Sequence, residues 1–245
     1  SKLKIQLCHI EAGIRSKPKN MPEEINRVLT DRISDKLFCP SNLAITNLKN
    51  EGRVDGVFFS GDVMFDLYLK MENSFRYDIF NKLNLKKNEF VLITLHRDFN
   101  VDDKERLLEI LKNIEFVKNK VKIVFPIHPR TMKMIKKYNF ESYLDNIVIT
   151  EPIDYLNLMG LLKMSDKVVT DSGGLQKEAY FSQKRCGVLS VDTGWQEIID
   201  NGWNVLLEPK DIENFLSNND SIDFIPNIYG DGKSGEKIVK EIVNW

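Results

Sequence analysis

One short stretch of the sequence, residues 170–178, has the residue types and the spacing that favour binding of an anion. The apolar run that ends at Val169 is typical of a buried strand, and Ser172 is well placed to cap the helix that follows. Gly173 and Gly174 leave the mouth of that helix without side chains. The first amide groups of the helix are therefore open and its dipole adds positive potential, so the stretch predicts a phosphate site.

Glu178 lies about one and a half turns into the same predicted helix. Its carboxylate could accept hydrogen bonds from hydroxyl groups such as those of a ribose. An ordinary capped helix after a tight turn would show the same spacing, because the stretch is neither a Walker loop nor a GxGxxG motif. Residues 170–178 alone therefore leave a nucleotide site and a purely structural turn open as alternatives.

Further polar side chains follow the other predicted strands, with acidic residues in the first part of the chain and basic residues in the second. They are Glu11, Glu23, Glu24, His96, Arg97, His128 and Arg130. Carboxylates that face cationic groups suit proton transfer beside an anionic leaving group. Each residue alone also has a structural interpretation, since Glu23 and Glu24 complement a helix dipole and His9 suits a core position. The pair His96-Arg97 is more suggestive, because a buried strand end seldom places two cations together without an anion.

A scaffold of alternating strands and helices is predicted to position these residues. The expected strands are 5–10, 36–39, 57–60, 90–95, 121–127, 146–150, 167–170, 187–191 and 204–207. The expected helices are 22–34, 43–51, one that ends near 72, 103–119, one that ends near 138, 155–164, 175–182, 212–216 and a last one capped by Ser234. This alternation indicates an α/β fold with a parallel, doubly wound sheet, in which ligands bind at the carboxyl ends of the strands.

The overall composition is that of an ordinary globular protein and excludes several functional classes. The 245 residues suffice for two modest domains, and the formal net charge of −1 gives no support for a nucleic-acid or membrane partner. The three cysteines are far apart in apolar runs, which is typical of core thiols in a reducing compartment rather than of metal ligands. No signal peptide opens the chain, so the expected location is the cytoplasm.

Eight short motifs occur together and in a fixed order. They are His9-Ile-Glu-Ala-Gly-Ile-Arg15, Met21-Pro-Glu-Glu-Ile-Asn-Arg27, Ser60-Gly-Asp62, Leu95-His-Arg97, Pro126-Ile-His-Pro-Arg130, Thr170-Asp-Ser-Gly-Gly-Leu-Gln-Lys-Glu178, Gly202-Trp-Asn204 and Tyr229-Gly-Asp-Gly-Lys233. With these motifs the chain resembles the non-hydrolysing UDP-N-acetylglucosamine 2-epimerases over essentially its whole length. Each motif alone is a weak signal, whereas all eight in order are highly specific.

The resemblance implies a fold of the glycosyltransferase B type, with two Rossmann-like domains and the nucleotide sugar in the cleft. Residues 1–72 would be the remaining part of the N-terminal domain, and 73–89 the connection between domains. Residues 90–225 would form the C-terminal UDP-binding domain. Residues 226–245 would form a final helix that packs back on the first domain.

The implied reaction interconverts UDP-N-acetylglucosamine and UDP-N-acetylmannosamine for the synthesis of cell-surface polysaccharide precursors. UDP is eliminated to give a 2-acetamidoglucal and is then added back with the opposite configuration at C2. The resemblance implies a UDP-sugar as the ligand, no metal or nicotinamide cofactor, and a homodimer.

The residue roles follow from the same resemblance, position by position. Glu11, Glu23 and His96 match the catalytic set, the two carboxylates as acid/base groups and the histidine beside the diphosphate. The UDP-binding positions are Arg97, Arg130, Ser172, Gly173, Gly174 and Glu178.

Some features of the family are missing from the sequence. The opening strand, the Gly-Thr-Arg-Pro-Glu loop and the His-Gly-Asp segment are absent, so we expect the first domain to be incomplete. The segment Ser190–Trp195 replaces one that usually carries an arginine and a glutamate near the nucleotide. Two alternatives therefore stay open: a hydrolysing or deoxy-sugar-specific UDP-sugar 2-epimerase, or an inactive UDP-sugar binding fragment.

Overall fold

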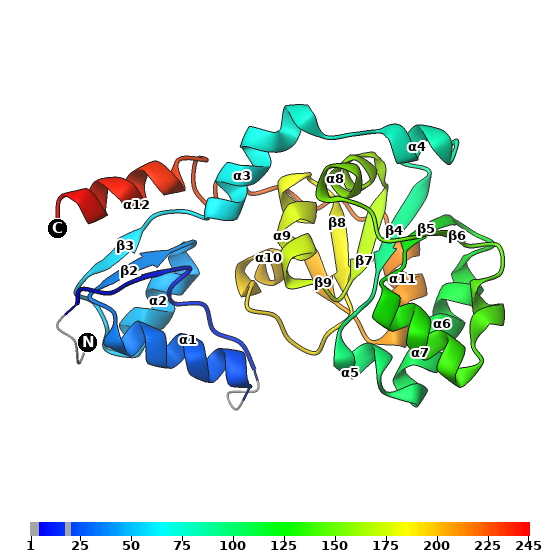
Figure 1. Cartoon of the computed structure of the whole chain (residues 1–245), viewed down its shortest axis with the longest axis horizontal. Helices are drawn as coiled ribbons and strands as arrows, with labels where there is room; N and C mark the ends of the chain where they lie inside the picture. Colours follow the sequence, from blue (N-terminus) through cyan, green and yellow to red (C-terminus); the bar gives the residue numbers. More distant parts are fainter. Residues whose placement is uncertain (1–4, 18–20) are drawn as a thin grey trace. The chain divides into compact units, whose positions relative to one another are not determined.

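A computed structural model describes residues 5–17 and 21–245, and these form two compact α/β units (Figure 1). Of the described residues, unit 1 takes in 5–17, 21–73, 192–200 and 225–245, and unit 2 takes in 74–191 and 201–224. Both units are built on parallel sheets, as the alternation of strands and helices predicted.

Unit 1 contains a three-stranded parallel sheet in the order β1-β2-β3. The strands are β1 (Cys8–Ile10), β2 (Lys36–Cys39) and β3 (Val57–Phe59). The helices are α1 (Pro22–Ile33), α2 (Asn42–Asn50), α3 (Val63–Met71), α10 (Gln196–Asp200) and α12 (Ser234–Val243). The core under this sheet is small and includes Leu37, Cys39 and Leu48. The first strand is shorter than predicted, because only Cys8–Ile10 pairs with β2.

The helices of unit 1 begin where short polar side chains or proline permit. Pro22 occupies the first turn of α1, and Ser41 caps α2 by accepting a hydrogen bond of 3.3 Å from the amide of Ala44, both as predicted. The prediction that Ser234 caps the last helix is wrong, because Ser234 is the first helical residue and Lys233 provides no side-chain cap.

The cap of α12 comes instead from another helix. Asp66 of α3 accepts hydrogen bonds from the amides of Ser234 (3.0 Å) and Gly235 (2.7 Å). A carboxylate at this end also complements the helix dipole. No local sequence pattern contains this contact, because Asp66 precedes Ser234 by 168 residues.

Unit 2 contains a six-stranded parallel sheet in the order β6-β5-β4-β7-β8-β9. The strands are β4 (Phe90–Thr94), β5 (Lys122–Pro126), β6 (Val148–Thr150), β7 (Lys167–Thr170), β8 (Arg185–Val188) and β9 (Asn204–Leu206). The helices are α4 (Asp78–Lys82), α5 (Asp98–Val101), α6 (Lys104–Val117), α7 (Pro129–Tyr138), α8 (Tyr155–Met164), α9 (Gly173–Phe181) and α11 (Ile212–Ser217). The described residues also include short 3-10 helices, namely η1 (Glu72–Ser74), η2 (Glu141–Leu144) and η3 (Pro209–Asp211).

The strand order of unit 2 creates a point where the direction of winding reverses. The chain moves outward from β4 to β5 and β6, returns to β7 beside β4, and then moves outward again to β8 and β9. Thr94 lies opposite Thr170 in the register of β4 and β7. The residues after these two strands therefore emerge next to each other, at the place where doubly wound sheets bind ligands.

Several boundaries in unit 2 differ from the predictions. The helix predicted at 103–119 runs from Lys104 to Val117 and is preceded by the short helix α5. Strand β8 covers Arg185–Val188 instead of 187–191. Residues 73–88, predicted to be irregular, include helix α4 and the end of η1. The short helices escaped prediction because a single turn carries too little periodicity.

A buried lysine binds the carbonyl oxygens at the C-terminal end of α11. Lys167 lies in β7, and its ammonium group donates to the carbonyl oxygens of Leu216 (2.8 Å) and Asn218 (2.6 Å). Burial lowers the pKa of Lys167 from its ordinary value. These carbonyls end a helix and lack intrahelical partners, so the lysine satisfies them and is itself solvated by the protein.

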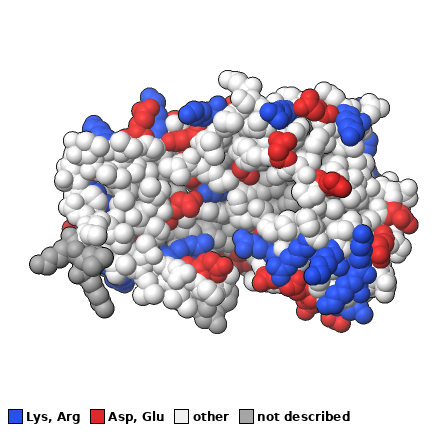
Figure 2. Space-filling model, viewed as in Figure 1, with Lys and Arg blue, Asp and Glu red and all other residues white. Residues whose placement is uncertain are grey.

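The exposed face of α7 carries a concentration of positive charge. Figure 2 shows lysines and arginines gathered over this helix, with carboxylates beside them. They include Arg130, Lys133, Lys136 and Lys137. In the described part of the chain no helix is both long and apolar enough to cross a membrane.

The contact of Asp66 with α12 leads to a testable prediction. Replacing Asp66 with Ala should lower the free energy of unfolding of the chain by about 1–2 kcal/mol, the usual range for loss of a helix cap. Amide hydrogen exchange at Ser234 and Gly235 should become faster. An Asp55→Ala variant, altered in an exposed turn of the same unit, serves as the control. Unchanged exchange at Gly235 in Asp66→Ala would show that the cap does not hold the helix.

Candidate active site

A single buried carboxylate organises the loops that follow β4 and β7. Asp171 directly follows β7 and is 3% exposed. Its oxygens accept hydrogen bonds from the amide of His96 (3.0 and 3.1 Å), the amide of Arg97 (2.8 Å) and the side chain of Asn100 (3.2 Å). A buried negative charge needs such donors, and here they fix the loop after β4 to the end of β7.

Asp171 also orients the imidazole of His96. The Nδ1 atom of His96 lies 3.1 Å from Oδ1 of Asp171. A carboxylate can only accept, so a hydrogen bond across this distance would place the ring proton on Nδ1. The ring of His128 lies beside it, with 5.8 Å between ring centroids. His128 caps α7 by accepting a hydrogen bond from the amide of Arg130 (3.1 Å) at Nδ1, which places its own proton on Nε2.

The predicted anion site at the start of α9 has the expected local geometry. Ser172 is the N-cap and accepts a hydrogen bond of 3.3 Å from the amide of Leu175, as predicted. The helix begins at Gly173, two residues earlier than predicted. Gly173 and Gly174 therefore place their amides in the first turn, before the first intrahelical hydrogen bond. The dipole of a nine-residue helix favours an anion at this point.

Glu178 lies further along α9 in a mostly buried position, with 7% of its surface exposed. Burial raises the pKa of Glu178 to about 7, and a hydrogen bond from Tyr155 and the charge of Lys177 only partly offset this effect. A carboxyl group that is partly protonated near neutral pH and lies on a helix at a strand end is suited to a ligand rather than to a surface ion pair.

Arg97 and Arg130 follow the ends of β4 and β5. Arg97 is exposed and precedes the short helix α5. Arg130 forms an ion pair with Asp102, in which Nε lies 3.1 Å from Oδ1, and its side chain is about half exposed. This pairing raises the pKa of Arg130 through the hydrogen bond with Asp102. A ligand that used Arg130 would have to share it with Asp102.

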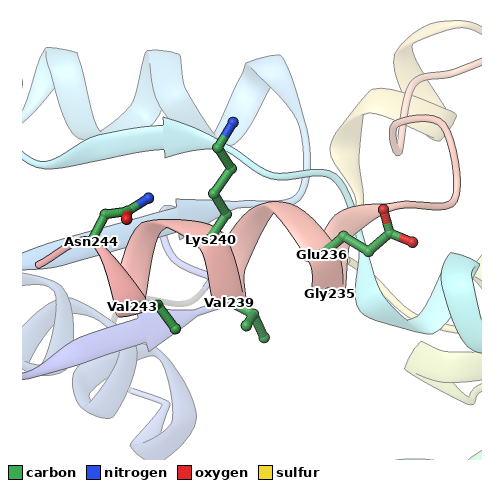
Figure 3. A pocket seen from close by; sticks show the side chains of 6 residues that line it. All are labelled: Gly235, Glu236, Val239, Lys240, Val243 and Asn244. Carbon is green, nitrogen blue, oxygen red and sulfur yellow. The ribbon is translucent and has the colours of Figure 1, made fainter.

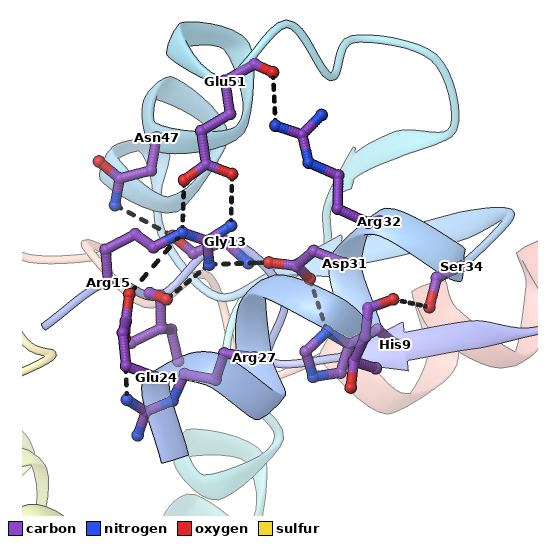
Figure 4. A network of polar contacts seen from close by, with 12 residues as sticks. His9, Gly13, Arg15, Glu24, Arg27, Asp31, Arg32, Ser34, Asn47 and Glu51 are labelled. Carbon is purple, nitrogen blue, oxygen red and sulfur yellow. Dashed lines mark hydrogen bonds and ion pairs between the residues drawn. The ribbon is translucent and has the colours of Figure 1, made fainter. Parts of the chain in front are cut away.

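A second polar cluster lies in unit 1, around the turn that follows β1 (Figure 4). Glu11 belongs to this turn, and Glu23 lies in the exposed first turn of α1. The next residue, Glu24, is 3% exposed and accepts hydrogen bonds from the amide (3.0 Å) and the hydroxyl (3.2 Å) of Ser16. The structure thus buries Glu24 and leaves Glu23, the predicted catalytic residue, accessible.

The remaining members of this cluster were not predicted from the sequence. Asp31 pairs with His9 (2.6 Å) and with Arg15 (2.8 Å), and Arg15 also binds both oxygens of Glu51 (2.7 and 2.8 Å). Arg15, Glu24 and Glu51 also line a pocket of about 740 Å³, whose wall comes mainly from α1, α2 and the loop at Arg15. His9, interpreted as a satisfied core histidine, has Asp31 as its partner but is only partly buried.

A second hollow, along α12, is less suited to a ligand. It is lined by Gly235, Glu236, Val239, Lys240, Val243 and Asn244 (Figure 3). All of these belong to α12 or follow it directly, so the hollow is a groove on one helix and cannot surround a small molecule. Within residues 5–17 and 21–245, no group of three or more His, Cys, Asp or Glu side chains is arranged to hold a metal ion.

The structure thus brings together part of the predicted site. His96 and Arg97, with Ser172 and the two glycines, lie at adjacent strand ends in unit 2, whereas Glu11 and Glu23 belong to unit 1. Asn100 was missed as a site residue, and Asp171 was given no role of its own. The position of Asp171 directly after a strand, beside a predicted His-Arg pair, was the signal that could have identified it.

Comparison with known proteins agrees with this geometry. A family model described as UDP-N-acetylglucosamine 2-epimerase matches residues 1–243. A UDP-N-acetylglucosamine 2-epimerase homolog of Methanococcus maripaludis is 43% identical over 253 residues, covering 100% of this chain and 70% of that protein. A UDP-2,3-diacetamido-2,3-dideoxy-D-glucuronate 2-epimerase of Pseudomonas aeruginosa is 42% identical over 212 residues, covering 84% of this chain and 58% of that protein.

A solved structure gives the same result at the level of the fold. The UDP-GlcNAc 2-epimerase of Methanocaldococcus jannaschii, in complex with UDP-GlcNAc and UDP, matches with a TM-score of 0.85 and 37% identity. The match covers 100% of this chain and 70% of that one. The predicted fold class of two Rossmann-like units is confirmed, and the chain spans about 70% of the length of such relatives.

The raised pKa of Glu178 leads to a prediction about pH. Its folded value of about 7 lies above the ordinary 4.5, so the folded state holds the proton more tightly than the unfolded state. The contribution of Glu178 to the free energy of unfolding is therefore at its most favourable below pH 4.5. It is lost as the pH rises through 7, and the free energy of unfolding falls by roughly 3 kcal/mol.

Denaturant unfolding of the native chain and of a Glu178→Gln variant, followed across this pH range, checks the expectation. The free energy of unfolding of the native chain should fall relative to that of the variant, which cannot ionise at this position. Parallel pH curves for the two proteins would mean that Glu178 ionises freely in the folded state.

Proposed function

The chain belongs to the UDP-N-acetylglucosamine 2-epimerase family, and we propose that it interconverts UDP-N-acetylglucosamine and UDP-N-acetylmannosamine without net hydrolysis. The observation that carries the proposal is the contact at the ends of β4 and β7, where Asp171 lies against His96 directly before Ser172, the cap of α9. The first turn of α9, with Gly173 and Gly174, suits a diphosphate. The buried carboxyl group of Glu178, further along the helix, suits a ribose.

The proposed reaction proceeds in two balanced steps. A base removes the proton from C2, the bond between C1 and the UDP oxygen breaks, and a double bond forms between C1 and C2. A proton is then delivered to the opposite face of C2, and UDP adds back to C1. Electrons are neither gained nor lost over the two steps, so the reaction needs no redox partner.

In this mechanism the residues of unit 2 stabilise the leaving group. The amides of Gly173 and Gly174 would receive the diphosphate at the positive end of α9. His96, oriented through Nδ1 by Asp171, would turn Nε2 toward the departing oxygen. Arg97 and Arg130 would add positive charge at the rim. These groups would stabilise the leaving diphosphate most strongly in the transition state, where it acquires charge.

The carboxylates of unit 1 would supply the proton transfers at C2. Glu23 is accessible at the start of α1, and Glu11 lies in the turn after β1. Two such groups, one protonated and one ionised, can remove a proton from one face of C2 and return it to the other. A homodimer, a cytoplasmic location and a role in making cell-surface polysaccharide precursors stay predictions for the whole protein.

The direct test is to incubate the protein with UDP-N-acetylglucosamine in deuterium oxide and to follow the products by proton NMR. We expect UDP-N-acetylmannosamine with deuterium at C2. Free sugar plus UDP would instead identify a hydrolysing enzyme. An unchanged substrate that still binds, or turnover only of another UDP-2-acetamido sugar, would also contradict the proposal.

The assignment of the ribose site can be tested separately. Replacing Glu178 with Ala should weaken binding of UDP by about 1–2 kcal/mol, because a hydrogen bond from a hydroxyl to a carboxylate is lost. Calorimetry with UDP measures the change. A Glu141→Ala variant, altered at an exposed carboxylate of the same unit, is the matched control. Equal affinities in all three proteins would remove Glu178 from the UDP site.

The acid/base assignment predicts a different pattern. Glu11→Gln and Glu23→Gln should each lower turnover by roughly 10²–10⁴-fold, the range for positioned acid/base groups. The affinity for UDP should stay unchanged, because the proposed UDP ligands lie in unit 2. Glu236→Gln, at an exposed carboxylate of α12, controls for loss of charge. A variant that lost only substrate affinity would assign that glutamate to binding.

A further inference from the structure

Glu11 has an unusual backbone conformation. Its φ is 65°, in the left-handed region, and the nearby Gly13 has a φ of 79°. Glycine adopts this region freely, whereas a residue with a Cβ atom does so only when its surroundings compensate for the strain. A proposed acid/base residue in this conformation therefore needs a restraint that holds it there.

The restraint is visible in the contacts of Asp31, which lies in α1 (Figure 4). One oxygen of Asp31 lies 2.6 Å from Nδ1 of His9. The other accepts a hydrogen bond of 3.1 Å from the amide of Gly13 and lies 2.8 Å from Nη1 of Arg15. His9 and Gly13 are the residues two positions before and two positions after Glu11. Asp31 therefore contacts the chain on both sides of Glu11. We call these contacts of Asp31 with His9, Gly13 and Arg15 the clamp.

The surroundings of Asp31 keep this clamp charged and fixed. Asp31 is 1% exposed. Burial alone would raise the pKa of its carboxyl group, but the hydrogen bonds from His9 and Arg15 outweigh burial and lower it. Arg15 is held in turn by Glu51, at 2.7 and 2.8 Å. The carboxylate can thus accept at both oxygens, which an amide in its place could not do.

The turn itself has no room to relax toward the rest of unit 1. A Cβ atom on Gly13 would lie 2.3 Å from the carbonyl oxygen of Ala44. The carbonyl of Gly13 accepts a hydrogen bond of 3.0 Å from Asn47, and the amide of Ala12 donates one of 3.0 Å to Phe38. Residues 12 and 13 are thus anchored on α2 and β2, and Asp31 contacts the residues two positions before and after Glu11.

We propose that Asp31 is a positioning residue that holds Glu11 in the left-handed conformation and so fixes the direction of its carboxylate. The role of that carboxylate in proton transfer rests on the proposed function, whereas the conformational coupling does not. A change from the left-handed to an extended backbone would turn the Cα–Cβ bond of Glu11 to another direction, and general acid/base catalysis tolerates little misplacement.

The first experiment measures the coupling directly. NMR backbone shifts and the amide-to-Hα coupling constant of Glu11 report its φ angle in the full chain. In Asp31→Asn, Glu11 should leave the left-handed region. In the matched control Glu51→Gln, which loosens Arg15 but keeps the contacts of Asp31 with His9 and Gly13, it should stay there. A left-handed Glu11 in Asp31→Asn would overturn the proposal.

A second variant covers the case in which Asp31→Asn fails to fold. His9→Phe keeps a ring at this position but removes one donor to Asp31, while the pair between Asp31 and Arg15 is retained. The proposal expects the same direction of change at Glu11, with a smaller amplitude. An unaltered φ of Glu11 in this variant would contradict the clamp.

A double-mutant cycle distinguishes positioning from a general loss of stability. Asp31→Asn should lower turnover roughly 10- to 100-fold with unchanged affinity for UDP, and it should cause no further loss when Glu11 is already Gln. An equal additional loss in the Glu11→Gln background would mean that Asp31 acts in another way. If Glu11→Gln alone kept full turnover, the proposed function of Glu11 would fail, while the NMR result would still decide the coupling.

Discussion

The structure of the candidate site depends on the burial of one negative charge, the carboxylate of Asp171. A buried carboxylate is tolerated only where donors replace the water it has lost. Here the backbone of the β4 loop, the side chain of Asn100 and the ring of His96 supply those donors. The next residue, Ser172, caps α9. The same charge therefore fixes the loop, the imidazole and the start of the helix at one point of the sheet.

Unit 1 also has a buried aspartate that binds the loop after a strand, in this case the loop after β1. Asp31 is buried, accepts from the backbone of the following turn and pairs with Nδ1 of a histidine, as Asp171 does. In both units a buried aspartate accepts hydrogen bonds from the backbone after a strand and lies against a ring nitrogen of a histidine. Asn100 extends the first network, since it also donates to the carbonyl of Leu189 (2.8 Å) and accepts from Arg106 (3.2 Å). Satisfied networks of this kind support precise placement of reacting groups.

Sequence patterns predicted the features that depend on local order, and missed those that depend on distant contacts. The strand before Ser172, its role as a cap and the parallel arrangement follow from periodicity and capping preferences, which act over a few residues. Periodicity does not predict which of Glu23 and Glu24 is buried, because both suit a first helical turn. Only the contact of Glu24 with Ser16 decides it. The clamp at Asp31 and the cap from Asp66 join segments far apart in the chain, so no spacing rule contains them.

The central claim is that the start of α9, beside Asp171 and His96, is a diphosphate site. The most direct measurement is an amide NMR titration of the chain with UDP and, separately, with uridine, which lacks the phosphates. UDP should shift the amide signals of Gly173, Gly174 and Leu175 and the ring signals of His96, and uridine should leave those four groups nearly unchanged. Equal shifts with both ligands, or shifts by UDP that avoid the start of α9, would contradict the account.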